Sequence, residues 1–352
     1  MPVLGDKLYF MKCKRFYYLI VGLLIVSIYF SGCKSEERIQ KNITSEDTEA
    51  KNKSAPSFTI RYRPVWTAQT QFAGIYMARK MGFYQDKGLN VIIQPGGPNY
   101  SVYDLLQKGE SDIVQMSLLT AVKRDAENGN LVNLAQLMQK TSLMLVGKKS
   151  RGINSLADFN GKRIGLWKTD ERLLASLFLL NHNLKMDIVD LDTSINLFLK
   201  DGLDVINVMR YNEYHLMLQA GINPQDLFTV SLDETQFNLA DNGLYTTRAF
   251  YEKHPQECRN FAVATINGWL YAFSHQEETI NTVLEIMNEN HLPANKPHQL
   301  WMLKELSNDF LAPKDKIGVL QESDFEKAKK ILIEQNMPTT NQTYKSFYPN
   351  GK

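Results

Sequence analysis

The first folded stretch of the chain alternates apolar and polar positions in a way that predicts a strand, a helix and a second strand. Residues 58–65 are rich in β-branched and aromatic side chains and alternate in polarity, as strands do. Apolar positions then recur at helical spacing over residues 72–81, and Gly82 can end that helix. A second apolar run, residues 89–93, stops at the turn sequence of residues 95–98. This succession predicts a parallel βαβ unit.

The same pattern returns later in the chain. Residues 163–167 predict a strand, Thr169-Asp170 can cap a helix that runs to Leu180, and residues 187–191 predict the returning strand. Trp66 and Trp167 therefore stand at equivalent places, at the end of the first strand of each unit. The repeat is one of topology and not of sequence, and it indicates two similar lobes.

The remaining pattern completes an α/β fold. Further strands are predicted at residues 113–116, 131–138, 143–146, 205–209 and 228–232, and helices at 102–106, 120–127, 211–220, 249–253, 256–275, 277–290, 298–311 and 323–335. We predict that lobe 1 comprises residues 58–145 and, after the chain returns, the mostly helical residues 243–352. Lobe 2 comprises residues 146–242. The last residues, 337–352, show no clear periodicity.

The N-terminus has the pattern of an export signal. The basic residues Lys12, Lys14 and Arg15 precede an uncharged, apolar run over residues 16–30, and Ser31-Gly32-Cys33 follows. The run is shorter than the roughly 20 residues that a spanning helix needs. Phe-Ser-Gly-Cys resembles the lipobox of bacterial lipoproteins, although Phe30 replaces the usual leucine. The resemblance implies a signal peptide over residues 1–32 and an acylated Cys33; a signal anchor with a chance cysteine is the alternative.

The segment after the cysteine has almost nothing to bury. Residues 33–57 are rich in Glu, Lys, Ser, Asn and Thr, which predicts a disordered tether behind the lipid. A tether of this kind implies a protein that is anchored to a bacterial membrane without crossing it, and that faces the periplasm or the cell exterior.

Composition excludes several classes of function. A net charge of +2 without a block of one sign does not indicate a nucleic-acid partner. The three cysteines, Cys13, Cys33 and Cys258, leave no internal disulfide once the first two are removed or modified. The six histidines show no ligand spacing, so no metal or other cofactor is predicted. No catalytic set of side chains can be placed.

Several ordered blocks of the chain resemble a known family. They read WTAQTQFAGIYMARKMGFYQDKGLNVIIQPGGP, GESDIVQMS, MRYNEYHLMLQAG and DNGLYTTRAFYEKHPQECRNFAVATINGWLYA. These blocks, spread over residues 58–350, resemble the substrate-binding lipoproteins of ABC importers, in the group related to pyrimidine-precursor binding for thiamine biosynthesis. The resemblance implies the two-lobed periplasmic-binding-protein (type II) architecture with a ligand cleft between the lobes. It also implies a small heterocyclic ligand, an ABC permease as partner and no enzymatic activity.

Two other functions occur on the same broad fold. One is a yeast-type pyrimidine synthase, which uses a cysteine-rich iron-binding motif that this sequence lacks. The other is a ligand-sensing subunit of a signalling system, which the sequence leaves open.

Aromatic and polar residues near the carboxyl ends of the predicted strands are the candidate ligand contacts, since ligands of α/β sheets bind at that edge. The candidates are Trp66, Gln69, Gln71, Tyr76, Gly97, Pro98, Ser117, Trp167, Tyr211, Asn212, Glu213 and Asp241. Two facing indoles suit a flat heterocycle. Asn212 and Glu213 can accept hydrogen bonds from exocyclic amino groups, which a buried carboxylate needs.

Each candidate also has a plain structural interpretation. Both tryptophans can belong to the core, and Tyr76 lies on a helical stripe that is more often core than ligand contact. Residues 211–213 can simply begin a helix with an acidic first turn. The glycines beside Pro98 can serve a turn alone.

Replacement of Cys33 by alanine tests the lipoprotein prediction. Cys33→Ala removes the thiol that would be acylated, so we expect an unprocessed chain without a lipid anchor. Mass spectrometry of the mature N-terminus is the measurement. An unmodified Cys33 in the wild-type chain, or a cut at another bond, would refute the prediction.

Overall fold

The computed structural model describes residues 58–168, 170–311 and 316–350. The predictions for the signal peptide, for Cys33 and for the tether lie outside the described residues. Within them, no helix is both long enough and apolar enough to cross a membrane.

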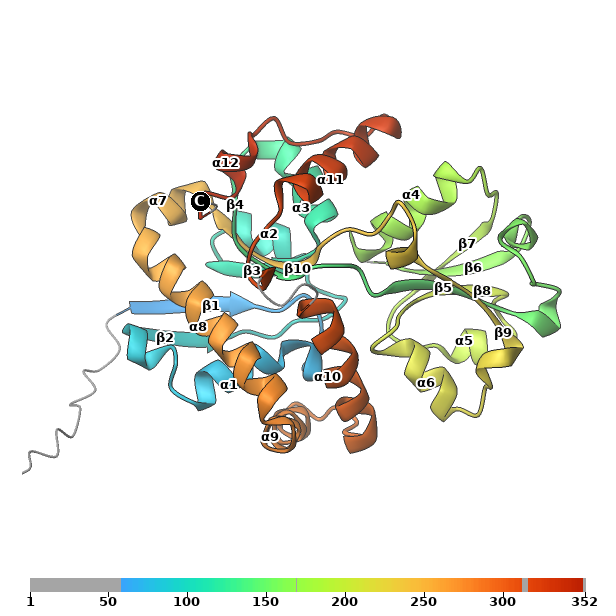
Figure 1. The fold of residues 1–352 in the computed structure, drawn as a ribbon, viewed down its shortest axis with the longest axis horizontal. Coiled ribbons are helices and arrows are strands. Elements are labelled where there is room, and N and C mark those ends of the chain that lie inside the picture. The colour runs from blue at the N-terminus through green and yellow to red at the C-terminus, as the bar shows by residue number, and fades with distance from the viewer. Residues whose placement is uncertain (1–57, 169, 312–315, 351–352) are drawn as a thin grey trace, which may run out of the picture. The chain divides into compact units, whose positions relative to one another are not determined.

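Five strands form the sheet of lobe 1, in the order β2-β1-β3-β10-β4 (Figure 1). They are β1 (Phe58–Arg63), β2 (Leu89–Ile93), β3 (Ile113–Met116), β4 (Leu131–Met138) and β10 (Asp241–Thr247). β1 is parallel to β2 and β3, whereas β10 runs antiparallel to both of its neighbours. The chain therefore returns to this sheet as β10, which lies between β3 and β4.

Helices pack on this sheet. They are α1 (Ala73–Lys80), α2 (Val102–Gln107), α3 (Leu118–Asn128), α7 (Arg248–Lys253), α8 (Pro255–Ser274), α9 (Gln276–Glu289), α10 (Lys296–Phe310), α11 (Glu322–Glu334) and α12 (Tyr344–Phe347). α1 and α8 approach closely because glycines stand at the crossing: a Cβ added to Gly268 would overlap the carbonyl oxygen of Gly74.

Lobe 2 repeats the strand order of lobe 1, with a sheet of order β7-β6-β8-β5-β9. Its strands are β5 (Leu143–Lys148), β6 (Arg163–Trp167), β7 (Asp187–Leu191), β8 (Val205–Met209) and β9 (Leu227–Ser231), and its helices are α4 (Leu173–Asn181), α5 (Asn196–Leu199) and α6 (Glu213–Gln219). In both sheets three parallel strands lie side by side, two of them from one βαβ unit. An antiparallel strand then lies next to the third parallel strand. The predicted two-lobed α/β fold is confirmed.

The chain crosses between the sheets twice, between Met138 and Leu143 and between Ser231 and Asp241. The lobe limits predicted at residues 145/146 and 242/243 fall inside β5 and β10, because pairing with distant strands decides where these strands begin. The C-terminal residues without periodicity include α12.

Three clusters of buried apolar side chains fill the fold, and they are distributed unevenly. One cluster is continuous from α3 of lobe 1 to α4 of lobe 2, through residues such as Val122 and Phe178. The other two belong mainly to single lobes, and the partly buried Trp66 packs against both. The lobes therefore share apolar packing on the α3–α4 side, and far less of it elsewhere.

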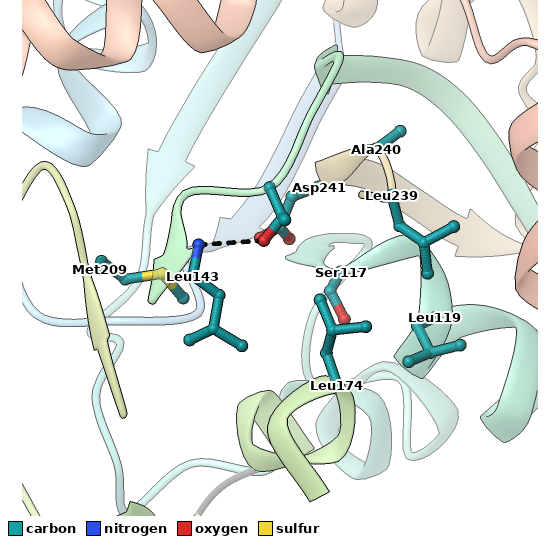
Figure 2. A pocket seen from close by; sticks show the side chains of 9 residues that line it. Ser117, Leu119, Leu143, Leu174, Met209, Leu239, Ala240 and Asp241 are labelled. Atoms are coloured by element: carbon teal, nitrogen blue, oxygen red, sulfur yellow. Dashed lines mark hydrogen bonds between the residues drawn. The ribbon is translucent and has the colours of Figure 1, made fainter. Parts of the chain in front are cut away.

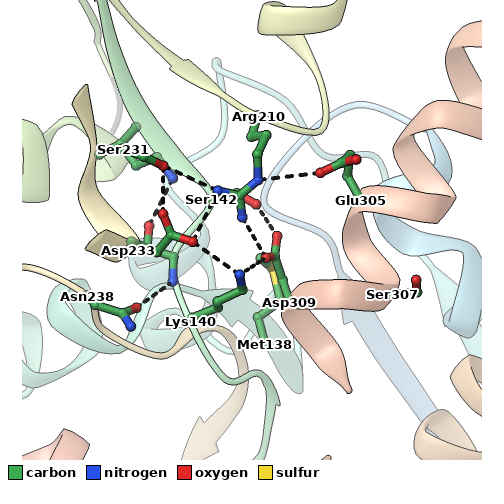
Figure 3. Close-up of polar contacts among 12 residues, drawn as sticks. Met138, Lys140, Ser142, Arg210, Ser231, Asp233, Asn238, Glu305, Ser307 and Asp309 are labelled. Carbon is green, nitrogen blue, oxygen red and sulfur yellow. Dashed lines mark hydrogen bonds and ion pairs between the residues drawn. The ribbon is translucent and has the colours of Figure 1, made fainter. Parts of the chain in front are cut away.

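A buried carboxylate ties the two crossings to α10 (Figure 3). The Asp309 side chain is completely buried and accepts a hydrogen bond from Arg210 at 2.8 Å. Ser142 also donates to it, and Lys140 lies 3.5 Å away. Arg210 and Lys140 both bond Asp233, at 3.1 Å each. We call Lys140, Ser142, Arg210, Asp233 and Asp309 the hinge network.

Removal of one cation from the hinge network should destabilise the fold. In Arg210→Met, the buried Asp309 carboxylate loses one cation and keeps only Lys140. We therefore expect the free energy of unfolding to fall by about 3 kcal/mol. Urea unfolding measures this. Lys330→Met, which breaks an exposed pair with Glu334, is the control and should change stability by less than about 0.5 kcal/mol. Equal effects of the two substitutions would contradict the structural role of the network.

Candidate functional site

Two cavities lie side by side where strands of both sheets reach their carboxyl ends, and Met209 of β8 lines both. The aromatic cavity is lined by Val65, Trp66, Gln69, Gln71, Trp167, Met209, Tyr211, Asn212 and Glu213. The hinge cavity is lined by Ser117, Leu119, Thr141, Leu143, Leu174, Met209, Leu239, Ala240 and Asp241 (Figure 2). Counting the part open to solvent, they enclose ≈ 380 Å³ and ≈ 320 Å³.

The two tryptophans of the aromatic cavity touch each other. The ring centroids of Trp66 and Trp167 are 6.0 Å apart, and the rings make an angle of 69°. A flat ligand stacked between two indoles would need parallel rings about 7 Å apart, since stacked carbon atoms lie about 3.5 Å from each other. The two rings therefore do not form parallel walls in this conformation. A ligand ring can enter between them only after they separate.

Amide side chains next to Trp66 are held in place by their neighbours. Gln69 donates to the Gln71 side-chain oxygen at 2.8 Å, and Gln71 donates to Asn242 at 3.4 Å. The short 3-10 turn that carries Gln71 and follows Gln69, Thr70–Phe72, is fixed to α10, because Gln299 accepts from the backbone N–H and the hydroxyl of Thr70. The amides are thus oriented before any ligand arrives.

Glu213 is a buried carboxylate in the aromatic cavity. Its Oε2 accepts from the backbone N–H of Met209 at 2.9 Å, and its Oε1 accepts from the Asn212 amide at 2.6 Å. Burial raises the pKa of Glu213 to about 7, despite these hydrogen bonds. Among the described residues, neither cavity has a lysine or arginine in its lining. The negative charge is therefore stabilised by neutral donors, which suits a ligand that donates further hydrogen bonds or carries positive charge.

Asp241 is a buried carboxylate with a neutral donor in the hinge cavity. Its Oδ1 accepts from the backbone N–H of Asn242 at 2.7 Å. Burial raises the pKa of Asp241 to about 6, and the charge of nearby Asp309 adds to this shift. Ser117, on the lobe 1 side of the cavity, caps α3 by accepting from the backbone N–H of Thr120 at 3.2 Å.

The structure brings most of the predicted site residues together. The aromatic cavity includes Trp66, Gln69, Gln71, Trp167, Tyr211, Asn212 and Glu213, and the hinge cavity includes Ser117 and Asp241. Tyr76, Gly97 and Pro98 line neither cavity. Tyr76 lies on the inward stripe of α1 and is buried in the lobe 1 core, so the packing interpretation holds for it. Gly97 has a φ of 135°, which only its backbone freedom explains.

Sequence reasoning missed the histidines beside the aromatic cavity. His298 of α10 hydrogen-bonds Asn212 at 3.0 Å, and its ring also contacts His215 of α6. The spacing of the six histidines along the sequence indicated no site, because the partners of these two histidines lie far away along the chain. Across the described ranges, no group of three or more His, Cys, Asp and Glu side chains is arranged to hold a metal ion.

Sequence comparisons match the chain to one family model and, over shorter stretches, to two pyrimidine phosphate synthases. A family model described as "NMT1/THI5 like" matches residues 69–279. The 4-amino-5-hydroxymethyl-2-methylpyrimidine phosphate synthase of Schizosaccharomyces pombe is 28% identical over 107 residues, which cover 30% of this chain and 31% of that protein. The enzyme of the same name from Legionella pneumophila is 27% identical over 101 residues, which cover 28% of this chain and 32% of that protein. The matches thus span about a third of these relatives.

Structure comparisons extend over most of the chain. The periplasmic aliphatic sulphonate binding protein SsuA of Escherichia coli has a TM-score of 0.60 at 12% identity, over 82% of this chain and 98% of that one. The alkanesulfonate-binding protein SsuA of Xanthomonas axonopodis pv. citri, bound to MOPS, has a TM-score of 0.61 at 13% identity, over 84% and 99%. At such identities the likeness concerns the fold, which is that of periplasmic binding proteins.

The raised pKa of Glu213 predicts a specific pH dependence of stability. The folded state binds this proton more tightly than the unfolded chain, whose carboxyl has the ordinary pKa of 4.5. The contribution of Glu213 to the stability of the wild type therefore decreases as pH rises from about 4.5 to 7. Glu213→Gln has no charge to bury, so above pH 7 it should be more stable than the wild type by about 3 kcal/mol, and near pH 4 about equally stable.

Urea unfolding of both proteins at several pH values measures the difference. Glu277→Gln makes the same substitution in an exposed first turn, at α9, and serves as the control. A stability difference that does not change between pH 4 and 8 would contradict the burial of a titrating Glu213.

Proposed function

This chain belongs to the NMT1/THI5-like family, and from that premise we propose that it is the substrate-binding lipoprotein of an ABC importer. In this proposal the anchored protein captures a small heterocycle, such as a thiamine pyrimidine precursor, and delivers it to a membrane permease. The fold of periplasmic binding proteins supports a binding role. The names of the curated relatives support a pyrimidine as the ligand.

The lining of the aromatic cavity is the observation that carries the proposal. It combines two indole rings, oriented amides and a buried carboxylate that only neutral donors stabilise. Aromatic rings offer a flat heterocycle a large contact area at a low entropic cost. The Glu213 carboxylate can accept from an exocyclic amino group, and that hydrogen bond would be stronger than one between neutral groups.

The charge of the lining argues against the ligand class of the structural neighbours. Both SsuA proteins are named for sulfonates, which are anions. Here the described residues that line the two cavities include Glu213 and Asp241 but no lysine or arginine. A buried sulfonate would meet like charge without a compensating cation, which is unfavourable. We therefore propose a neutral or cationic ligand with hydrogen-bond donors.

Binding would proceed through separation and closure of the two lobes. Trp66 of lobe 1 and Trp167 of lobe 2 part to admit the ligand ring, which then replaces their edge-to-face contact by stacking. The ligand shifts the equilibrium toward the closed form, because only that form contacts it from both lobes. The closed form then docks on the permease.

A pyrimidine-precursor synthase is the second candidate function, and the names of the curated relatives favour it. The two candidates differ in outcome. A binding protein returns its ligand unchanged, whereas a synthase accumulates product over time. Incubation with cofactor and iron, followed by mass spectrometry of the small molecules, distinguishes them.

Ligand binding can be tested on the chain from residue 34 onward. We expect 4-amino-5-hydroxymethyl-2-methylpyrimidine to bind with one site per chain in calorimetry and to raise the melting temperature. At 100 times its Kd it would stabilise the fold by about 2.7 kcal/mol. MOPS, which the Xanthomonas neighbour binds, is the matched negative control. Binding of MOPS but not of the pyrimidine would overturn the proposed ligand class.

Variants of the tryptophans then locate the site. Trp66→Ala and Trp167→Ala should each weaken binding by about 1–3 kcal/mol, the range for removal of an aromatic partner in a desolvated site. Trp66→Phe keeps a ring and should retain more affinity than Trp66→Ala. Tryptophan emission should also change on ligand addition, since the two indoles must separate. If truncation lowers stability and leaves affinity unchanged, the indoles are only core residues.

A further inference from the structure

A chain of hydrogen bonds runs from α10 of lobe 1 into the aromatic cavity. The Nδ1 atoms of His215 and His298 are 2.8 Å apart. The Nε2 atom of His298 lies 3.0 Å from the Asn212 side-chain oxygen. The Asn212 nitrogen lies 2.6 Å from Oε1 of Glu213. Each link has ordinary hydrogen-bond length, so the four side chains form one connected series.

Chemistry fixes the direction of every donor in this series. An ionised carboxylate only accepts, so the Asn212 NH₂ group must face Glu213, and the Asn212 oxygen must face His298. His298 therefore carries its proton on Nε2. Its Nδ1 is then an acceptor when the ring is neutral, and His215 supplies the proton between the two rings. Burial lowers the pKa of His298 to about 4, which agrees with a neutral ring.

The series joins the two lobes, because His298 belongs to α10 whereas Asn212, Glu213 and His215 belong to lobe 2. Two further interactions hold His298 in place. Its backbone N–H donates to the side-chain oxygen of Asn295, the N-cap of α10, at 3.1 Å. His215 is itself stacked on Trp301 of α10, with 4.5 Å between centroids and a ring angle of 4°. His298 is 5% exposed, so little water competes for its Nε2 proton.

We propose that His298 is a positioning residue for the ligand site: it reaches across from lobe 1, fixes the Asn212 amide and thereby orients the Glu213 carboxylate toward the ligand. The inference rests on the proposed binding function and adds a residue that does not line the cavity. Without His298, the Asn212 oxygen loses its donor, and the amide is free to turn its NH₂ group away from Glu213. With His298 in place, closure of the lobes on the α6–α10 side would both enclose the ligand and orient the side chains that recognise it.

Substitutions of His298 can separate this role from simple packing. His298→Gln places an amide NH₂ near the original Nε2 position, whereas His298→Asn places it near Nδ1, out of reach of Asn212. His298→Phe keeps the ring and removes both nitrogens. With 4-amino-5-hydroxymethyl-2-methylpyrimidine as the probe in calorimetry, we expect Asn and Phe to weaken binding roughly tenfold. Gln should recover most of that loss.

A double-mutant cycle shows whether His298 acts through Asn212. In an Asn212→Ala background, His298→Phe should cause no further loss of affinity. If the loss is the same with and without Asn212, His298 does not position the Asn212–Glu213 pair, and the proposal fails. Equal affinities of the Gln and Asn variants would overturn it as well.

A measurement without ligand keeps the inference testable if the pyrimidine does not bind. ¹³C NMR of labelled glutamate carboxyls, with Glu213→Gln for assignment, gives the titration midpoint of Glu213. His298→Phe should raise this midpoint by about one pH unit, which is the same tenfold expressed in proton binding. His298→Gln, and His275→Phe at an exposed histidine, should leave it near the wild-type value. An unchanged midpoint in His298→Phe refutes the positioning role, whereas absent pyrimidine binding refutes only the proposed ligand.

Discussion

Burial of carboxylates is the constraint on which both the architecture and the site of this protein depend. At the crossings between the lobes, Asp309 is removed from water completely, and Arg210 and Lys140 compensate its charge (Figure 3). These partners come from the strand crossing and from the end of β8, while Asp309 comes from α10. An unpaired charge at this depth would be strongly destabilising, so satisfying Asp309 also fixes where the chain passes from one lobe to the other.

The carboxylates of the cleft are also buried, but their partners are neutral and not cationic. The hydrogen-bond donors of Glu213 and Asp241 are backbone N–H groups and an amide, and the cavity lining has no lysine or arginine in the part of the chain that the structure describes. Burial raises the pKa of both groups, to about 7 and about 6. It also raises the pKa of Asp309, so the difference between the sites lies in their partners and not in the direction of the pKa shift. A protein that needed these residues only for stability would gain by neutralising them. Their burial in a cavity where two lobes meet supports the proposed ligand, which would supply further donors.

Sequence reasoning succeeded where the signal is local. The strands over residues 131–138, 163–167 and 187–191 were predicted with the bounds that the structure has, because alternation and length decide them within a few residues. The rule that ligands bind at carboxyl ends of strands placed most candidates around one cleft. Tyr76 was among the candidates although its helical stripe indicated core, and the structure places it in the core. The insertion of β10 into the middle of the first sheet and the contact of His298 with Asn212 depend on pairing across long sequence separations, for which one sequence carries no local signal.

The interactions between the lobes indicate which side of the cleft can open at low cost. On the α3–α4 side, one apolar cluster continues from lobe to lobe, so separation there would expose core side chains such as Val122 and Phe178 to water. On the α6–α10 side, the lobes meet through the His298–Asn212 hydrogen bond and the stack of His215 on Trp301. Arg210, just before α6, adds polar contacts to α10, since its carbonyl oxygen accepts from Trp301 at 3.4 Å and its side chain lies 3.5 Å from Glu305. Hydrogen bonds of this kind can be exchanged for bonds to water at a small net cost. The aromatic cavity borders this polar side, because Asn212 and Glu213 begin α6 and the turn that carries Gln71 is fixed to α10. A hinge motion about the shared apolar side would therefore uncover the aromatic cavity first, and closure on a ligand that bridges the two lobes would form again the hydrogen bond and the ring stack that opening breaks.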